Sequence, residues 1–172
     1  VNRPGPYQSE RSRAYGDAAE AGRLTADLAT GDFDADGDAD LAVADPGEAR
    51  VFLFTGDTRP AMAATYRFPG HARPQALAAI DLDGDGQDDL VVLRQGPDGP
   101  VLTGLQVLRE GDSPTFRNRG DHRVGELTAA SRLRLTDLDE SGGPDAVIWG
   151  RAGDEPGMAT VRNLTIVQPA AR

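Results

Sequence analysis

The chain has 172 residues and a net charge of −10, from 28 acidic and 18 basic residues, with two histidines and no cysteine. The lack of cysteine excludes disulfides and thiolate zinc sites, and no apolar run approaches the ~20 residues that a membrane-spanning helix needs. No basic stripe with interleaved aromatic residues is present, which argues against nucleic-acid binding.

The first 70 residues predict an extension followed by one repeat. Residues 1–23 form a proline-rich N-terminal extension with Tyr7 and Tyr15, which is expected to be either an added outer strand or disordered. Stretch 17–28 could form one or two helical turns. The first repeat is expected over 24–70, with strands at 24–30, 40–44, 50–55 and 65–68. An Asp-rich loop, Pro46-Gly47 and Gly56-Asp57 separate these strands.

The rest of the chain predicts two more repeats of the same kind. The second spans 71–121, with strands at 76–80, 90–94, 101–108 and 115–117 and a hairpin turn at 96–100. The third spans 122–172, with strands at 132–135, 146–149 and 160–167 but no fourth strand. Each repeat is therefore expected to be a four-stranded antiparallel meander, with the third one incomplete.

Each repeat contains an Asp-rich loop that leads into a short apolar run. The loops begin at Asp32, Asp81 and Asp137, at spacings of 49 and 56 residues. The runs that follow read LAVA, LVVL and AVIW, and they are apolar on both faces. Such strands must be covered on both sides, as the inner strands of stacked propeller sheets are. The sequence therefore predicts an all-β fold of three β-propeller blades.

Three blades are fewer than the roughly 4–8 that a closed propeller contains. Repeat arrays also need neighbours to bury the face of each unit. The chain is therefore expected to be a fragment of a longer array, to pair as a homodimer that closes a six-bladed ring, or to pack as an open arc. In the homodimer, the N-terminal extension would supply the missing outer strand of the partner.

The loops read DFDADGDAD, DLDGDGQDD and DLDESGGPD, so acidic side chains alternate along a tight turn. Eleven of the 28 acidic residues are proposed to bind through their side chains, and the remaining 17 nearly balance the 18 basic residues. Carboxylates this close repel one another unless a cation neutralises them. Hard oxygen ligands favour Ca²⁺, with Mg²⁺ as second choice, over zinc or copper.

The predicted metal ligands fall at equivalent positions of the three loops. They are Asp32, Asp34, Asp36, Asp38 through its backbone oxygen, and Asp40; Asp81, Asp83, Asp85, Gln87 through its backbone oxygen, and Asp89; and Asp137, Asp139, Ser141, Gly143 through its backbone oxygen, and Asp145. Because Ser141 replaces the central aspartate, the third site carries one charge fewer. We therefore expect two strong calcium sites and a weaker third.

Two other structures contain acidic loops of this length. An EF-hand needs an acidic ligand at position 12 and a following helix, but Val43, Val92 and Ile148 stand there and the next residues favour a strand. The second is a surface turn without metal. Recurrence of the motif in register with apolar flanks argues against it.

The segments TGDFDADGDADLAVAD, AIDLDGDGQDDLVVL and LTDLDESGGPDAVIW resemble the FG-GAP and VCBS-type repeats of calcium-binding β-propellers, which also form the head of integrin α chains. The literal Phe-Gly and Gly-Ala-Pro elements are absent, so the similarity is to the broader VCBS-like subgroup. The resemblance implies a bladed β fold, structural calcium, an exported or cell-surface location and a role in binding or adhesion.

Few residues outside the loops suggest chemistry. Trp149 aligns with Ala44 and Leu93 of the other repeats, which favours core or inter-blade packing over stacking on a sugar. His71 and His122 are interpreted as solvated loop residues. Five arginines are interpreted as lying on solvated strand faces, in preference to a role in binding an acidic partner or a glycan. They are Arg117, Arg119, Arg123, Arg132 and Arg134.

The expected function is a calcium-stabilised, non-enzymatic binding, adhesion or scaffolding module of a secreted or cell-surface protein. Its partner is a protein or a glycan that the sequence does not identify. One alternative is a propeller-type hydrolase or lyase, or its accessory domain, although no catalytic residue is identified. The other alternative is an assembly protein that pairs half-propellers.

Overall fold

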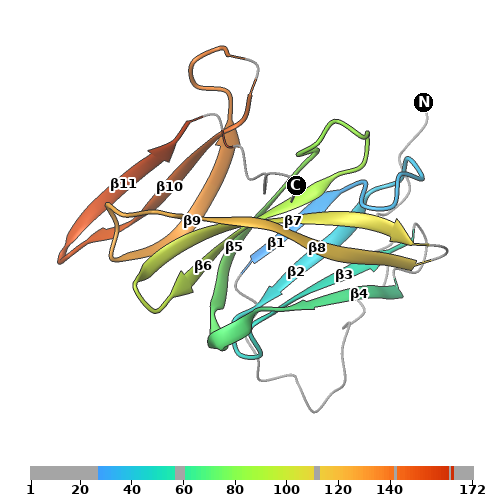
Figure 1. Ribbon diagram of the computed structural model, residues 1–172, viewed down its shortest axis with the longest axis horizontal. Coiled ribbons are helices and arrows are strands. Elements are labelled where there is room, and N and C mark those ends of the chain that lie inside the picture. The colour runs from blue at the N-terminus through green and yellow to red at the C-terminus, as the bar shows by residue number, and fades with distance from the viewer. Residues whose placement is uncertain (1–26, 57–60, 111–112, 142, 163, 165–172) are drawn as a thin grey trace, which may run out of the picture.

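The computed structural model describes residues 27–56, 61–110, 113–141, 143–162 and 164 (Figure 1). The first sheet contains β1 (Asp27–Gly31), β2 (Asp40–Asp45), β3 (Arg50–Thr55) and β4 (Ala61–Arg67). The second contains β5 (Arg73–Ile80), β6 (Asp89–Gly96), β7 (Gly99–Glu110) and β8 (Ser113–Arg123). The third contains β9 (Ala129–Thr136), β10 (Asp145–Ala152) and β11 (Glu155–Val161).

Each sheet is an antiparallel meander in which strands that follow one another in the chain also pair. A short 3₁₀ turn, Pro69–His71, connects the first two sheets. The expected all-β fold of propeller-like blades is confirmed, and the predicted 96–100 hairpin turn is present between the paired residues Gly96 and Gly99. The expectations for the extension 1–23 lie outside the described residues.

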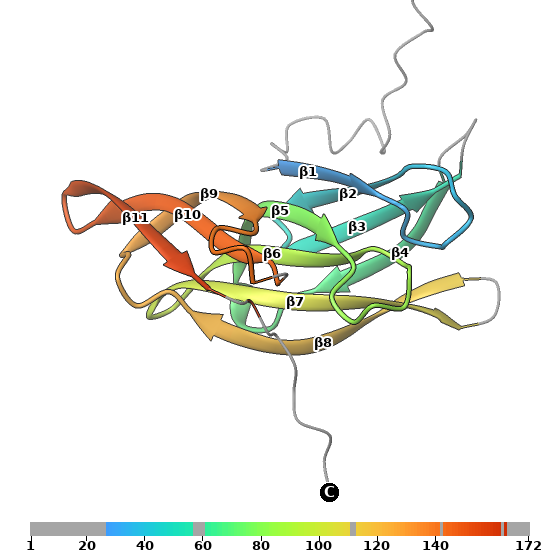
Figure 2. The ribbon, with the colours of Figure 1, turned by 90° about the horizontal axis from the view of Figure 1, so that it is seen from above.

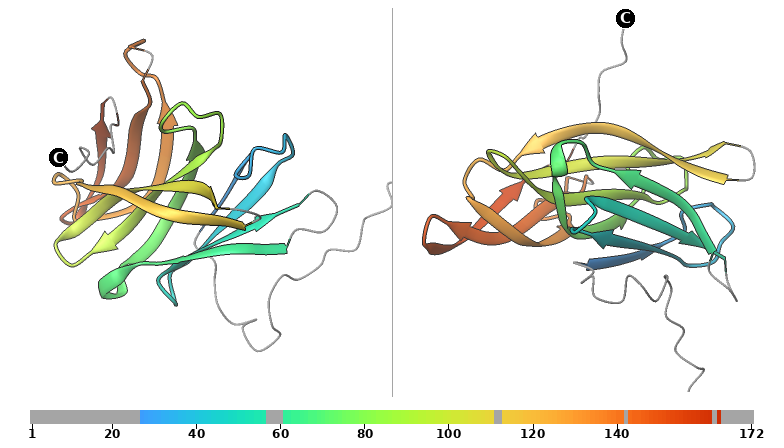
Figure 3. Two further views of the ribbon diagram at one scale, coloured as in Figure 1. Left: turned by 45° about the vertical axis from the view of Figure 1, so that its right-hand side comes forward. Right: turned by 90° about the horizontal axis from the view of Figure 1, so that it is seen from below.

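The three sheets stand next to one another in an open arc and do not close into a ring (Figures 1 and 3). The first strands β1, β5 and β9 are neighbours, and the last strands β4 and β8 also pack together. Figure 2 shows β1, β5 and β9 side by side from above. Pairing with a second copy to close a six-bladed ring stays a prediction.

Some strand boundaries differ from those expected. The last strand of the third sheet was expected at 160–167 but runs over Glu155–Val161. Gly153 has a φ of 64° and, with Asp154, makes a two-residue turn that starts this strand earlier than predicted. In the second sheet, β8 has 11 residues, where only 115–117 was expected. Its partner β7 has 12 residues, which gives β8 a longer edge to pair with.

Strand β6 explains why the Asp-rich loops lead into runs that are apolar on both faces. Leu90 and Val92 belong to the core between the first and second sheets, which also contains Phe33. Val91 and Leu93 belong to the core between the second and third sheets. All four residues of this run are fully buried, so the prediction of two covered faces is confirmed for β6.

Among the residues that the structure describes, one face of the third sheet packs into the second core and the other face is only partly covered, with Val147 buried. Ala146 and Ile148 of β10 pack into the second core. Trp149 points away from that core and is 38% exposed. The expectation that Trp149 packs in a core is therefore wrong for the described part of the chain, and packing of Trp149 against a further blade stays a prediction.

Candidate metal-binding loops

The three Asp-rich loops connect the first two strands of each sheet, namely β1–β2, β5–β6 and β9–β10. The fourth residue of every loop has a left-handed backbone: Ala35 at φ 58°, Gly84 at 79° and Glu140 at 57°. The sixth residue is also left-handed in the first two loops, where Gly37 has φ 91° and Gly86 has φ 87°. Glycine adopts this conformation without steric penalty, but Ala35 and Glu140 carry strain.

The first aspartate of each loop organises the turn through backbone N–H groups. Asp32 accepts hydrogen bonds from the N–H groups of Asp36 and Gly37, both at 3.1 Å. Asp81 accepts from Gly84 at 2.7 Å and from Gly86 at 2.9 Å. Burial alone would raise the pKa of Asp81, but these backbone hydrogen bonds outweigh it and lower the pKa.

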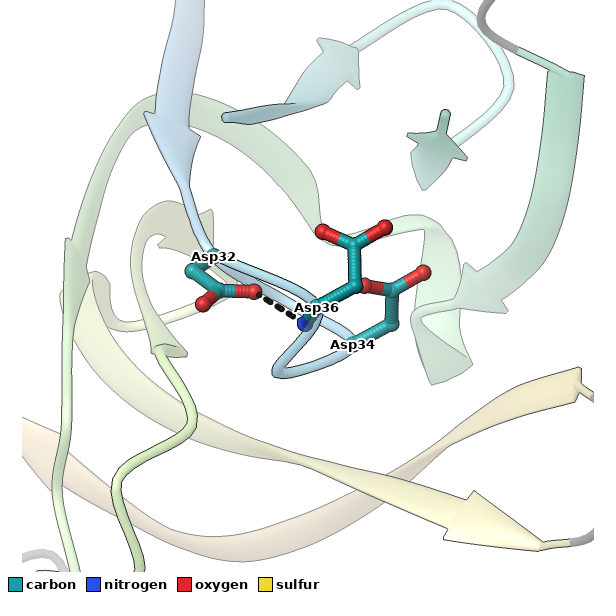
Figure 4. Close-up of side chains that lie close together, drawn as sticks. All are labelled: Asp32, Asp34 and Asp36. Carbon is teal, nitrogen blue, oxygen red and sulfur yellow. Dashed lines mark hydrogen bonds between the residues drawn. The ribbon is translucent and has the colours of Figure 1, made fainter. Parts of the chain in front are cut away.

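Each loop gathers three carboxylates whose candidate ligand atoms lie within 4.8 Å of one another. The groups are Asp32, Asp34 and Asp36; Asp81, Asp83 and Asp85; and Asp137, Asp139 and Asp145. Figure 4 shows the first group, with the hydrogen bond from the N–H of Asp36 to the carboxylate of Asp32. Three of the predicted carboxylate ligands of each loop are therefore close in space, in a geometry that can hold a hard cation.

Asp34 shows the effect of this crowding most clearly. Its Oδ1 atom is buried and has no hydrogen-bond partner. Burial, and then the nearby charge of Asp36, raise the pKa of Asp34. A buried carboxylate oxygen without a donor is unfavourable, and a bound cation would satisfy it. This oxygen therefore fits the chemistry of a calcium ligand.

The last aspartate of the first two loops lies outside the groups of three. Asp40 is buried and accepts hydrogen bonds from the N–H groups of Phe33 at 2.9 Å and Gly56 at 3.2 Å. Asp89 accepts in the same way from Leu82 at 3.2 Å and Val107 at 2.8 Å. Each of these two carboxylates thus joins the start of its loop to the third strand of the sheet or the residue just after it.

Burial makes this position electrostatically unfavourable for a charge. Desolvation raises the pKa of Asp40 despite its two backbone donors. The pKa of Asp89 rises to about 6, again mainly because of burial. In the third loop, Asp145 belongs to the group of three carboxylates. Like Asp40 and Asp89, it also accepts a hydrogen bond from the N–H of the second loop residue, here Leu138 at 2.7 Å.

The neighbours of the groups differ from loop to loop. Gln106 donates a side-chain hydrogen bond to Asp83 of the second loop. Arg162 places its guanidinium 3.7 Å from a carboxylate oxygen of Asp139 in the third loop. An arginine also lies at the first loop, where Arg109 donates to the carbonyl oxygen of Asp34 at 2.9 Å, so a neighbouring arginine does not by itself distinguish the third site.

The other predicted ligands also lie in the loops. The N–H of Asp38 donates to Asp36 at 2.9 Å, and that of Ser141 donates to Asp139 at 3.2 Å. Gly143 is half-buried between Ser141 and Asp145. The side chain of Gln87 turns away from its own loop and donates to the carbonyl oxygens of Phe33 at 2.7 Å and Val107 at 3.2 Å.

Two aspartates that the sequence reading did not single out connect the first sheet to the second. Asp88 accepts a hydrogen bond from the N–H of Asp32 at 3.0 Å. Asp27 accepts one from the N–H of Leu77 at 2.9 Å. The sequence distinguishes Asp88 from its equivalents, since the other two loops have Ala39 and Pro144 at that position. The doublet Asp88-Asp89 could therefore have indicated a separate role for Asp88.

Residues 32–92, which run from the first acidic loop into the strand after the second, match the family model of the FG-GAP-like repeat. FG-GAP repeats are typical of extracellular proteins. In the part of the chain that the structure describes, no helix is long and apolar enough to cross a membrane. The sequence match and the blade-like sheets agree, and both support an FG-GAP-type repeat protein.

Proposed function

We propose that this chain is a non-enzymatic binding or scaffolding module whose blades are stabilised by calcium bound in the three acidic loops. The observation that carries the proposal is the threefold recurrence of three close carboxylates at the same turn of each sheet. The donors are all hard oxygens, which suit Ca²⁺. Backbone oxygens of the same loops would complete the coordination.

The unpartnered Oδ1 of Asp34 supports this proposal. In a site without a cation, three adjacent carboxylates and a buried oxygen without a donor raise the free energy of the native state. A bound calcium ion would remove both penalties. It would also fix the turn that holds the first strand of a blade to the second.

Calcium would act through linkage, because a ligand that binds only the native state stabilises it by RT ln(1 + [L]/Kd). At ten times Kd this amounts to about 1.4 kcal/mol per site. Extracellular calcium modules have Kd values of about 10⁻⁴–10⁻³ M, a range that is of use only where calcium is abundant. The proposal therefore includes export to the cell surface or the medium, with a role in adhesion or scaffolding.

Isothermal titration of the chelator-treated chain with CaCl₂ tests the proposal. We expect two tighter sites from the first two loops and a weaker third. Titration with MgCl₂ at the same concentrations is expected to give weaker binding, because Mg²⁺ demands stricter octahedral geometry. The absence of calcium binding at millimolar concentration would contradict the proposal.

A further inference from the structure

A depression lies where β9 meets β5, at the edge formed by the first strands of the sheets. Its main part has a volume of about 870 Å³. A second part of about 400 Å³ shares Gln75, Arg132, Arg134 and Trp149 with the first, so the two are continuous. Volumes of this size match sites for small-molecule ligands. The depression is separate from the acidic loops.

The lining of the main part carries three arginines and no acidic residue, although the protein as a whole has a net charge of −10. The side chains of Arg132 and Arg134 are exposed, and neither makes an ion pair or hydrogen bond within the described residues. The third, Arg151, donates to the carbonyl oxygen of Asp154 at 2.6 Å. Among the described residues, nothing competes for these two guanidinium groups, so they can bind an anion; arginine pairs with carboxylates in a bidentate geometry.

An aromatic ring stands directly beside these arginines. Trp149 on β10 is the cross-strand partner of Arg132 on β9, and it is 38% exposed. The register of the two strands shifts between Trp149 and Gly150. A Cβ at position 150 would lie 1.9 Å from the carbonyl oxygen of Ala129, so only glycine permits this approach. Bulges of this kind re-aim side chains next to binding sites.

Neutral polar groups complete the depression. Gln75 makes no side-chain hydrogen bond within the described part of the chain. Gln95 uses its amide nitrogen in two long contacts of 3.4 Å, and its carbonyl oxygen stays available as an acceptor. Asp27, the acidic residue at the edge of the smaller part, already accepts the N–H of Leu77. Amides of this kind suit the hydroxyl groups of a saccharide.

We infer that this depression binds an acidic saccharide, with its carboxylate on Arg132 and Arg134 and the apolar face of a sugar ring on Trp149. The inference builds on the proposed binding function and names the ligand class. Free guanidinium groups select the carboxylate, the indole provides a flat apolar surface, and the amides of Gln75 and Gln95 face the hydroxyls. No one of these three features alone would distinguish a uronic acid from a simple anion.

Trp149 is the only tryptophan in the chain, so its fluorescence reports binding directly. The calcium-loaded chain is titrated with trigalacturonate, with the neutral galactose trimer as the matched saccharide. A third titration uses an acidic peptide of equal charge, and a fourth uses inorganic phosphate. We expect saturable quenching by trigalacturonate, weakened by salt, and no saturation by the other three probes up to millimolar concentration.

The variant Arg132→Gln/Arg134→Gln is expected to lose at least about tenfold in affinity for trigalacturonate, since each charge-assisted hydrogen bond contributes to the free energy of binding. The matched control Arg117→Gln/Arg123→Gln removes two exposed arginines of β8 and should bind as the unmodified chain does. Equal quenching by the neutral trimer, the peptide or phosphate would overturn the inference, and so would equal binding by both double variants or no binding of trigalacturonate at all.

Calcium titration of the same samples separates this inference from the proposed function. The variant Arg132→Gln/Arg134→Gln should bind calcium unchanged and lose saccharide binding. This result supports both the saccharide inference and the calcium proposal. Normal calcium binding without saccharide binding overturns the inference alone. Failure of calcium binding, with saccharide binding intact, contradicts the calcium proposal and leaves the depression as a saccharide site.

Discussion

Asp88 of the second loop accepts the N–H of Asp32 at 3.0 Å, and its own N–H donates to the carbonyl oxygen of Asp32 at 2.9 Å. The first loop and the second are thus joined by a reciprocal pair of hydrogen bonds between neighbouring sheets. Gly31 makes room for the contact, since a Cβ there would lie 2.7 Å from a carboxylate oxygen of Asp88. A repeat match that spans both loops corresponds to a physical connection between two blades.

Replacing Asp88 by alanine should therefore destabilise the interface between the first two sheets. Asp88→Ala leaves the partly buried N–H of Asp32 without its acceptor, which is expected to lower the free energy of unfolding by about 1–2 kcal/mol. Asp88→Asn keeps an acceptor oxygen and should recover most of the loss. Urea unfolding of the three proteins measures this difference, and equal stability of Asp88→Ala and the unmodified chain would contradict it.

The left-handed backbone of Ala35 predicts a stabilising substitution. Ala35→Gly removes the steric penalty of φ 58°, for a gain of about 1 kcal/mol reduced by the greater freedom of glycine in the unfolded chain. Ala39 lies in the same loop without a left-handed φ, so Ala39→Gly is expected to be neutral or destabilising. Thermal melting checks both, and a higher melting temperature for Ala39→Gly than for Ala35→Gly would refute the prediction.

The third loop should gain calcium affinity when its missing charge is restored. Ser141→Asp gives it the central carboxylate that the other two loops have, and we expect the weakest of the calcium sites to tighten about tenfold. Asn118→Asp on the exposed part of β8 adds the same charge away from the loops and should leave that site unchanged. Calorimetric titration with calcium distinguishes the two variants; no change in Ser141→Asp would count against the assignment of the third site.

The raised pKa of Asp89 gives the chelated chain an unusual pH dependence. Its pKa is about 6 in the folded chain, against an ordinary value of 3.8. Between these values the native state binds more protons than the unfolded state, so stability falls as pH rises from about 4 to about 6. The change is at most about 3 kcal/mol. Asp40 acts in the same direction.

Urea unfolding in EGTA across this pH range measures the effect. Asp89→Asn is expected to be less stable overall, because an amide cannot accept both backbone N–H groups, but to show a flatter pH profile. The exposed Asp98→Asn is the matched control and should keep the slope. Stability of the chelated unmodified chain that rises between pH 4 and pH 6 would be the contrary result.

Much of the fold could be predicted because it depends on short-range patterns. The apolar run 90–93 indicated a strand covered on both faces, and β6 has that environment. The alternating aspartates predicted groups of carboxylates, and the loops bring three together in each repeat. Both patterns are local, so the sequence shows them without knowledge of the partners.

The parts that the sequence did not predict depend on the neighbours of each residue. The alignment of Trp149 with Ala44 and Leu93 predicted burial, but none of the three described sheets covers Trp149, which is 38% exposed. The sequence did not predict the role of Asp88, because Asp88 accepts the N–H of Asp32 only when the first loop lies beside the second. The two-residue turn at Gly153 was missed because the residues after it resemble loop residues in composition.

The central claim is that cations in the acidic loops stabilise the blades. Thermal melting with excess calcium and with EGTA tests this most directly on three proteins: the unmodified chain, Asp34→Ala/Asp83→Ala, and the control Asp98→Asn/Asp154→Asn, which removes two exposed acids outside the loops. The unmodified chain and the control should lose on the order of 10 °C on chelation. The loop variant should melt low in both conditions, with little response to calcium. Equal melting temperatures for the unmodified chain with calcium and with EGTA would contradict the account.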